Sequence, residues 1–263
     1  MAVLKDDVRL KIERADKHLD DFHAVLRAFI DSNPYVIDTK RDPQTRCLVY
    51  YLVTAQPIPD ELAMIASDIL QNLRTALDYL VCAMVRGNNK SDKASAFPIV
   101  DKAPVSTKER AWFEAKTQGK PEEAKDVIRR IKPYKGEDDV LWRLHKLNNR
   151  DKHRLLFTVG AAFRSLDLGS MLRQDLEAEW SKVSNIPIPN ISFLMNPNDA
   201  RFPLKAGDEL FMDVPDAQPR NIKFFFDVAI DEPGVVAGES LIAVLRASRQ
   251  RVGRVVEMFA GYY

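Results

Sequence analysis

The side chains best suited to chemistry lie close together between Leu141 and Leu156, in the run LWRLHKLNNRDKHRLL. This run holds two histidines, one aspartate, two asparagines and five Lys or Arg residues, a density that packing alone explains poorly. Imidazole titrates near neutral pH and serves as a general acid or base, and cationic side chains stabilise negative charge on a phosphate. We therefore expect a polar site on the helix formed by this run, although the run matches no signature that names a reaction.

Cleavage of RNA is the reaction that these residue types suit best. His153 would act as general base on a ribose hydroxyl and His145 as a general acid. Neighbouring cations would stabilise the charge that develops on the phosphate. The candidate catalytic residues are His153, His145, Arg150, Arg154 and Lys152.

One face of the same helix is basic. At about 100° per residue, four cations fall within one sector of the helix. We call them the basic ridge: Arg143, Lys146, Arg150 and Arg154. Such a ridge is typical either of a solvated helix face or of a surface that binds an anion.

An earlier run, NLRTALD at 72–78, has the same mixture of apolar spacing and embedded polar groups. Burying Asp151 requires a donor nearby, and either Arg74 or Asn72 is a candidate. Arg74 and Asp78 are four residues apart and can instead pair with each other. We expect a polar network made of Asn72, Arg74, Asp78, Asn148 and Asp151. Such a network can also be a structural pin that fixes the register of two helices.

Composition excludes several classes of function. The chain has 39 Lys and Arg against 38 Asp and Glu, so no global field draws it to nucleic acid or membrane. The N-terminus lacks the apolar region of a signal peptide, and no apolar run approaches the roughly 20 residues of a membrane-spanning helix. Its two cysteines are expected to be free thiols in a reducing cytoplasm. No zinc spacing and no glycine-rich nucleotide motif occurs, so we expect neither a metal nor an obligatory cofactor.

Apolar periodicity predicts the order of the elements. Helices are expected at 5–32, 60–87 with Asp60 as its cap, 106–117, 121–131, from Glu137 or Asp138 through the motif run, 168–182 and 238–259. Strands are expected at 35–38, 46–54, 155–163, 191–195, 209–214 and 222–230. Proline 121 is expected in the first turn of its helix, and Phe97-Pro98-Ile99 is expected to be a buried anchor within a loop.

This order predicts an α+β fold in which up-and-down helices form a bundle beside a mostly antiparallel β-sheet. The first, central, motif and last helices would make the bundle. We expect a helical core with an inserted β-hairpin at 1–156, a β-rich segment at 157–236, and a last helix at 237–263 that returns to the core.

Four motifs in this order, NLRTALD, FPI at 97–99, LWRLH at 141–145 and DKHR at 151–154, resemble those of a widespread group of bacterial proteins to which no reaction is attached. More distantly, the helical bundle resembles HEPN proteins, whose active members are metal-independent ribonucleases of toxin and antiviral systems. That resemblance implies a dimer acting on RNA. The HEPN motif is Arg, four to six residues, then His, whereas here Asn148 stands five residues before His153 and Arg150 only three.

Three functions remain open from the sequence. The first is a HEPN-like ribonuclease. The second is a non-catalytic module whose basic ridge binds nucleic acid or a phosphorylated small molecule. The third is a structural or interaction protein whose polar network fixes the fold.

Overall fold

Helices and strands of this chain gather in different parts of the fold. The computed structural model describes residues 2–93, 95–151, 159–169, 176, 180, 194–195 and 202–262, without the side chains of residues 2–5 and 151. One unit comprises Met1–Arg27, Pro59–Thr158 and Asp231–Tyr263, and we call it the helical unit. The other comprises Ala28–Ile58 and Val159–Ile230, and we call it the strand unit. The predicted α+β class is confirmed.

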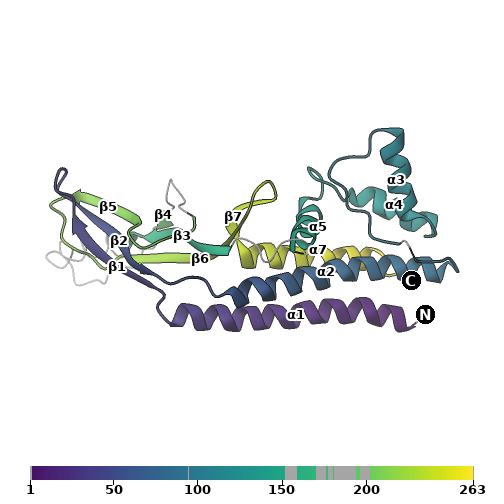
Figure 1. Ribbon diagram of the computed structural model, residues 1–263, viewed down its shortest axis with the longest axis horizontal. Helices are drawn as coiled ribbons and strands as arrows, with labels where there is room; N and C mark the ends of the chain where they lie inside the picture. Colours follow the sequence, from purple (N-terminus) through teal and green to yellow (C-terminus); the bar gives the residue numbers. More distant parts are fainter. Residues whose placement is uncertain are drawn as a thin grey trace. The chain divides into compact units, whose positions relative to one another are not determined.

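The helical unit is built around α2 (Asp60–Gly87), which packs against α5 (Asp139–Asp151) and α7 (Leu241–Met258). Helix α1 (Ala2–Asp31) runs beside them (Figure 1). Apolar side chains along α2 are fully buried because they recur at helical spacing, and Leu70, Leu73, Leu77 and Leu80 are all inaccessible to solvent. Arg249 of α7 donates to both carboxylate oxygens of Asp16 on α1, at 2.6 and 2.8 Å.

Acidic residues at the starts of α2 and α5 act in two different ways. The prediction that Asp60 caps α2 was wrong, because Pro59 occupies the cap position and Asp60 lies in the first helical turn. An acidic residue in that turn still interacts favourably with the helix dipole. Asp138 precedes α5 and accepts a hydrogen bond from the amide of Leu141 at 3.1 Å, so it caps the motif helix as expected.

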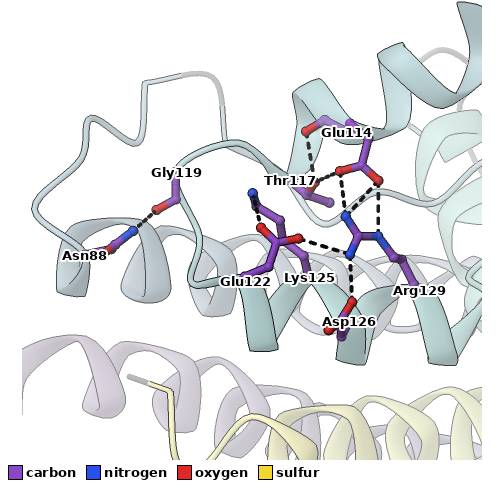
Figure 2. Close-up of polar contacts among 8 residues, drawn as sticks. All are labelled: Asn88, Glu114, Thr117, Gly119, Glu122, Lys125, Asp126 and Arg129. Carbon is purple, nitrogen blue, oxygen red and sulfur yellow. Dashed lines mark hydrogen bonds and ion pairs between the residues drawn. The ribbon is translucent and has the colours of Figure 1, made fainter.

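Two short helices, α3 (Thr107–Thr117) and α4 (Glu122–Ile131), follow the loop after α2. Ser106 and Glu109 form a capping box at the start of α3. Pro121 stands at the cap of α4, one position before the first turn where we expected it. Figure 2 shows Arg129 of α4 paired with Glu114 of α3 and with two acidic residues of its own helix, so ion pairs join α3 to α4.

The strands form two antiparallel sheets. Strands β1 (Tyr35–Arg41), β2 (Cys47–Ala55) and β5 (Glu209–Pro215) form one sheet in the order β1-β2-β5. Strands β3 (Val159–Asp167), β4 (Leu194–Met195), β6 (Lys223–Glu232) and β7 (Val236–Ser240) form the other in the order β4-β3-β6-β7. Of these strands, β7 and the last two residues of β6 belong to the helical unit. Leu52 from the first sheet and Phe163 from the second belong to one hydrophobic core.

The expected β-hairpin gains a third strand, and the chain before the last helix differs from expectation. The hairpin of β1 and β2 was expected within 1–156, and it pairs with β5. Strand β7 was not expected, and the last helix begins at Leu241 rather than at residue 238, because the chain up to Ser240 is still extended. Most of the helix expected at 168–182, and the start of the strand expected at 155–163, lie outside the described residues.

Candidate functional site

Arg74 of α2 is a buried cation whose hydrogen-bonding groups are turned toward polar partners. It is only 7% exposed, and its Nη1 lies 2.8 Å from Oδ1 of Asp78, one turn along the helix. Its Nη2 donates to the carbonyl oxygen of Phe97 at 3.0 Å, and Asp78 accepts from the amide of Phe97 at 2.9 Å. Burial lowers the pKa of the Arg74 guanidinium, and the charge of Asp78 opposes that shift.

The loop residue held in this way is the anchor expected from the sequence. Phe97 is 1% exposed and Ile99 is 4% exposed, so the prediction of a buried anchor is confirmed. The two polar side chains therefore fix both backbone groups of Phe97, and the ring of Phe97 fills the core.

His145 of α5 lies against the same arginine. Its Nδ1 is 3.4 Å from Nε of Arg74, and its Nε2 is 3.0 Å from the side-chain amide of Asn149. A guanidinium only donates, so Nδ1 of His145 is the acceptor. The ring is consequently held between α2 and the next turn of α5.

The rest of the expected polar network is only partly assembled here. Asn148 is 3% exposed, so it faces the interior as expected. Asn72 lies on another face of α2, where its amide donates to the carbonyl of Asp68 at 2.8 Å and accepts from Lys11 of α1 at 3.4 Å. Asn72 and Arg74 are two positions apart, and a helix turns them to different sides. The side chain of Asp151 lies outside the described part of the chain.

Each described cation of the basic ridge is paired with a carboxylate. Arg143 binds Glu239 at 3.0 Å, and Lys146 binds Asp101 at 2.6 Å. Arg150 binds Glu232 at 2.5 Å and donates to the carbonyl oxygen of Pro233 at 2.7 Å. The ridge therefore ties α5 to β7, to the turn between β6 and β7 and to the loop before α3. Arg154, together with Lys152 and His153, lies outside the described residues.

A cavity of about 600 Å³ opens beside α5 within the helical unit. Its lining residues are Asp101, Lys135, Trp142, Lys146, Asn149, Arg150, Pro233, Gly234 and Val235. Its described lining holds three cations and one carboxylate. When Glu232, the partner of Arg150, is counted as well, one positive charge remains in excess, so the cavity is electropositive in balance. We call it the cation cavity.

Asp101 is the carboxylate at the centre of this lining. Its Oδ1 accepts from the indole of Trp142 at 3.0 Å and lies 2.6 Å from Nζ of Lys146. The hydrogen bond from Lys146 lowers the pKa of Asp101, and the hydrogen bond from Trp142 acts in the same direction. Nζ of Lys135 lies 4.7 Å from the centre of the Trp142 ring. The cavity wall is thus a connected set of charges around one indole.

Sequence reasoning found Lys146, Asn149 and Arg150 and missed most of the opposite wall. Asp101 and Lys135 stand in irregular loops where no periodic pattern marks them. The remaining lining residues are 233–235. There the turn dipeptide Pro233-Gly234 predicts a bend but not its position against α5.

Comparison with known proteins adds no assignment. No model of a protein family, no curated protein and no solved structure matches this chain. Within the described residues, no three His, Cys, Asp or Glu side chains are grouped so that they could hold a metal ion. None of the described helices combines the length and the apolar character that crossing a bilayer requires. Cys47 and Cys82 are both free thiols.

Proposed function

We propose that this protein binds a phosphate-bearing small molecule in the cation cavity. The observation that carries the proposal is the described lining of that cavity, which brings Lys135, Lys146, Arg150 and Asp101 together and is electropositive in balance. A volume of about 600 Å³ is within the range of small-molecule sites. Lys and Arg side chains bind phosphate oxygens through charge-assisted hydrogen bonds.

The pairs within the cavity suggest how an anion would enter. Asp101 occupies Lys146 in the ligand-free protein, so an incoming phosphate has to compete with this carboxylate. The Asp101 side chain is 67% exposed, and water can therefore solvate it when it leaves Lys146. Lys146 is then the cation that the ligand recruits with the smallest rearrangement of the fold.

The test is calorimetric titration of the purified protein with inorganic pyrophosphate at low and at moderate salt. Wild type is expected to bind, with an affinity that falls as salt rises. Lys146→Met should weaken binding at least tenfold, and Asp101→Asn should strengthen it severalfold because Lys146 loses its competitor. Lys17→Met removes an exposed cation of α1 and is the matched control. Equal binding by wild type and Lys146→Met would refute the proposal.

The position of His145 supports a second proposal, metal-independent cleavage of RNA. The imidazole is held by Arg74, and its Nε2 lies 3.0 Å from the side-chain amide of Asn149, which lines the cation cavity. It is therefore suited to move a proton at a bound phosphate. Total RNA incubated with the protein in EDTA should be cleaved, and His145→Ala and His153→Ala should each abolish cleavage. Intact RNA in the presence of folded wild type would reject catalysis and leave the binding proposal standing.

A further inference from the structure

A second cavity, of about 300 Å³, meets the cation cavity at Asp101, which lines both. Its lining residues are Val100, Asp101, Lys102, Pro104, Lys108, Glu109 and Trp112. Val100, Pro104 and Trp112 give it an apolar surface, and Lys102 pairs with Glu109 at 2.9 Å on its rim. We call it the Trp112 groove. An electropositive cavity and an apolar groove thus adjoin within the helical unit.

Trp112 is an exposed indole beside this apolar surface. It lies on α3 and is 49% exposed, whereas its neighbour Phe113 is 5% exposed and holds the helix to the fold. Nζ of Lys116 lies 5.6 Å from the centre of the indole ring. An exposed aromatic ring of this kind gives planar ligands a stacking surface, and a base stacks on such a ring whatever its identity.

We propose that the ligand is a mononucleotide, with its phosphate in the cation cavity and its base in the Trp112 groove. This inference rests on the proposed function, because it names the class of phosphate-bearing molecule that the same site takes. The continuity of the two cavities at Asp101 carries it, since one molecule with an anionic end and a flat, weakly polar end matches both.

A free nucleotide fits these residues better than a strand of RNA does. A strand needs a continuous track of available cations along its backbone. Along the described part of α5, Arg143 is paired with Glu239 and Arg150 with Glu232. The chain as a whole carries a formal charge of only +1, so it supplies no broad field for a polyanion.

The experiment compares adenosine 5′-monophosphate, ribose 5-phosphate and inorganic pyrophosphate by calorimetric titration. On wild type, the nucleotide should bind about tenfold more tightly than ribose 5-phosphate, because base stacking adds to the phosphate contacts. Trp112→Ala should reduce this difference to less than about threefold without changing pyrophosphate binding, and Trp112→Phe should restore most of it. Phe113 stays in place in both variants, so α3 keeps its buried anchor.

Three outcomes would overturn the inference. Equal affinities of wild type for the nucleotide and for ribose 5-phosphate would show that the groove does not take the base. An unchanged nucleotide affinity in Trp112→Ala would have the same meaning. A single-stranded RNA decamer that binds far more tightly than the mononucleotide would identify a strand as the ligand. In all three cases, pyrophosphate binding that is lost in Lys146→Met would still support the proposed function.

Discussion

Arg74 and Asp78 lie one turn apart on α2 and together bind both backbone groups of a single residue, Phe97. The arginine donates to the carbonyl oxygen, and the aspartate accepts from the amide. The two side chains differ in solvent contact, since 9% of the Arg74 side chain is exposed and 35% of the Asp78 side chain. The loss of one partner therefore has different consequences from the loss of the other.

We expect Asp78→Asn to destabilise the protein more than Arg74→Met does. The asparagine leaves a buried guanidinium charge without its counter-ion, which costs about 3–5 kcal/mol. The methionine leaves a carboxylate that water can reach and that keeps the amide of Phe97, so the cost is about 1–3 kcal/mol. Urea unfolding of the two variants and wild type measures the difference in free energy.

Asp68→Asn is the matched control, because Asp68 is exposed on the same helix. It should change the free energy of unfolding by less than about 0.5 kcal/mol. If Arg74→Met proved the more destabilising variant, the buried charge would not be the dominant cost at this pair.

Much of the helical unit is predictable from local pattern. The spacing of apolar residues along α2 places Leu70, Leu73 and Leu77 on one buried face, and the bounds of this helix agree with those expected. The pairing of Arg74 with Asp78 also follows from their separation of four residues. Local spacing does not reveal what such a pair binds, because Phe97 lies in a loop without a period.

The wall of the cation cavity and the use of the basic ridge were not predictable. Arg143 and Glu239 are 96 residues apart, and Arg150 and Glu232 are 82 residues apart. A helical wheel shows which cations share a face but not which distant carboxylates the fold brings to that face. An unrecognised strand, β7, is what places Glu239 there.

The hydrogen-bonding state of His145 is a separate prediction. Because Arg74 can only donate, Nδ1 of His145 carries no proton, and the proton of the neutral ring is on Nε2. The amide of Asn149 then presents its oxygen to Nε2, which a half-turn of the amide achieves in place. Long-range ¹H–¹⁵N NMR spectra at pH 7 should show an unprotonated Nδ1 and a protonated Nε2. In Arg74→Met this preference should be lost, and a wild-type spectrum with a protonated Nδ1 would contradict the assigned geometry.

Arg150 is expected to hold the turn between β6 and β7 against α5. It contacts both Glu232 and the carbonyl oxygen of Pro233, and a planar guanidinium can bind two acceptors at once. Arg150→Lys keeps the charge and loses this forked geometry. Hydrogen–deuterium exchange followed by mass spectrometry should show faster exchange at 233–240 in the variant. Lys17→Met is the control, and it should leave exchange at 233–240 unchanged. A similar exchange rate in wild type and Arg150→Lys would show that the turn is held by its own strand pairing and not by Arg150.

Asp101 should contribute a pH-dependent part of the stability. Its pKa is lowered in the folded protein, so its contribution is present above its ordinary pKa of about 4 and is lost as the pH falls through the lowered value. The side chain is 67% exposed, so the contribution at pH 7 is only about 0.2–1 kcal/mol. Thermal unfolding of wild type and Asp101→Asn should show a small difference at pH 7 that shrinks below about pH 4. A difference that grows in acid would contradict the cited cause.

Gly160 at the start of β3 is expected to tolerate no side chain. A Cβ at this position would lie 2.7 Å from Cβ of Pro203 and 3.1 Å from the ring of Phe202. Leu204 donates its amide to the carbonyl oxygen of Ala161 at 3.0 Å, so the segment after Pro203 is held close to β3 and cannot withdraw without breaking that bond. Gly160→Ala should therefore lower the free energy of unfolding by about 1–3 kcal/mol, as overpacking does. Gly207→Ala is a useful comparison, because its Cβ would meet no atom within 4 Å and its cost would come from a φ of +92° alone. Urea unfolding that ranked Gly160→Ala as neutral would show that the strand unit has room at this contact.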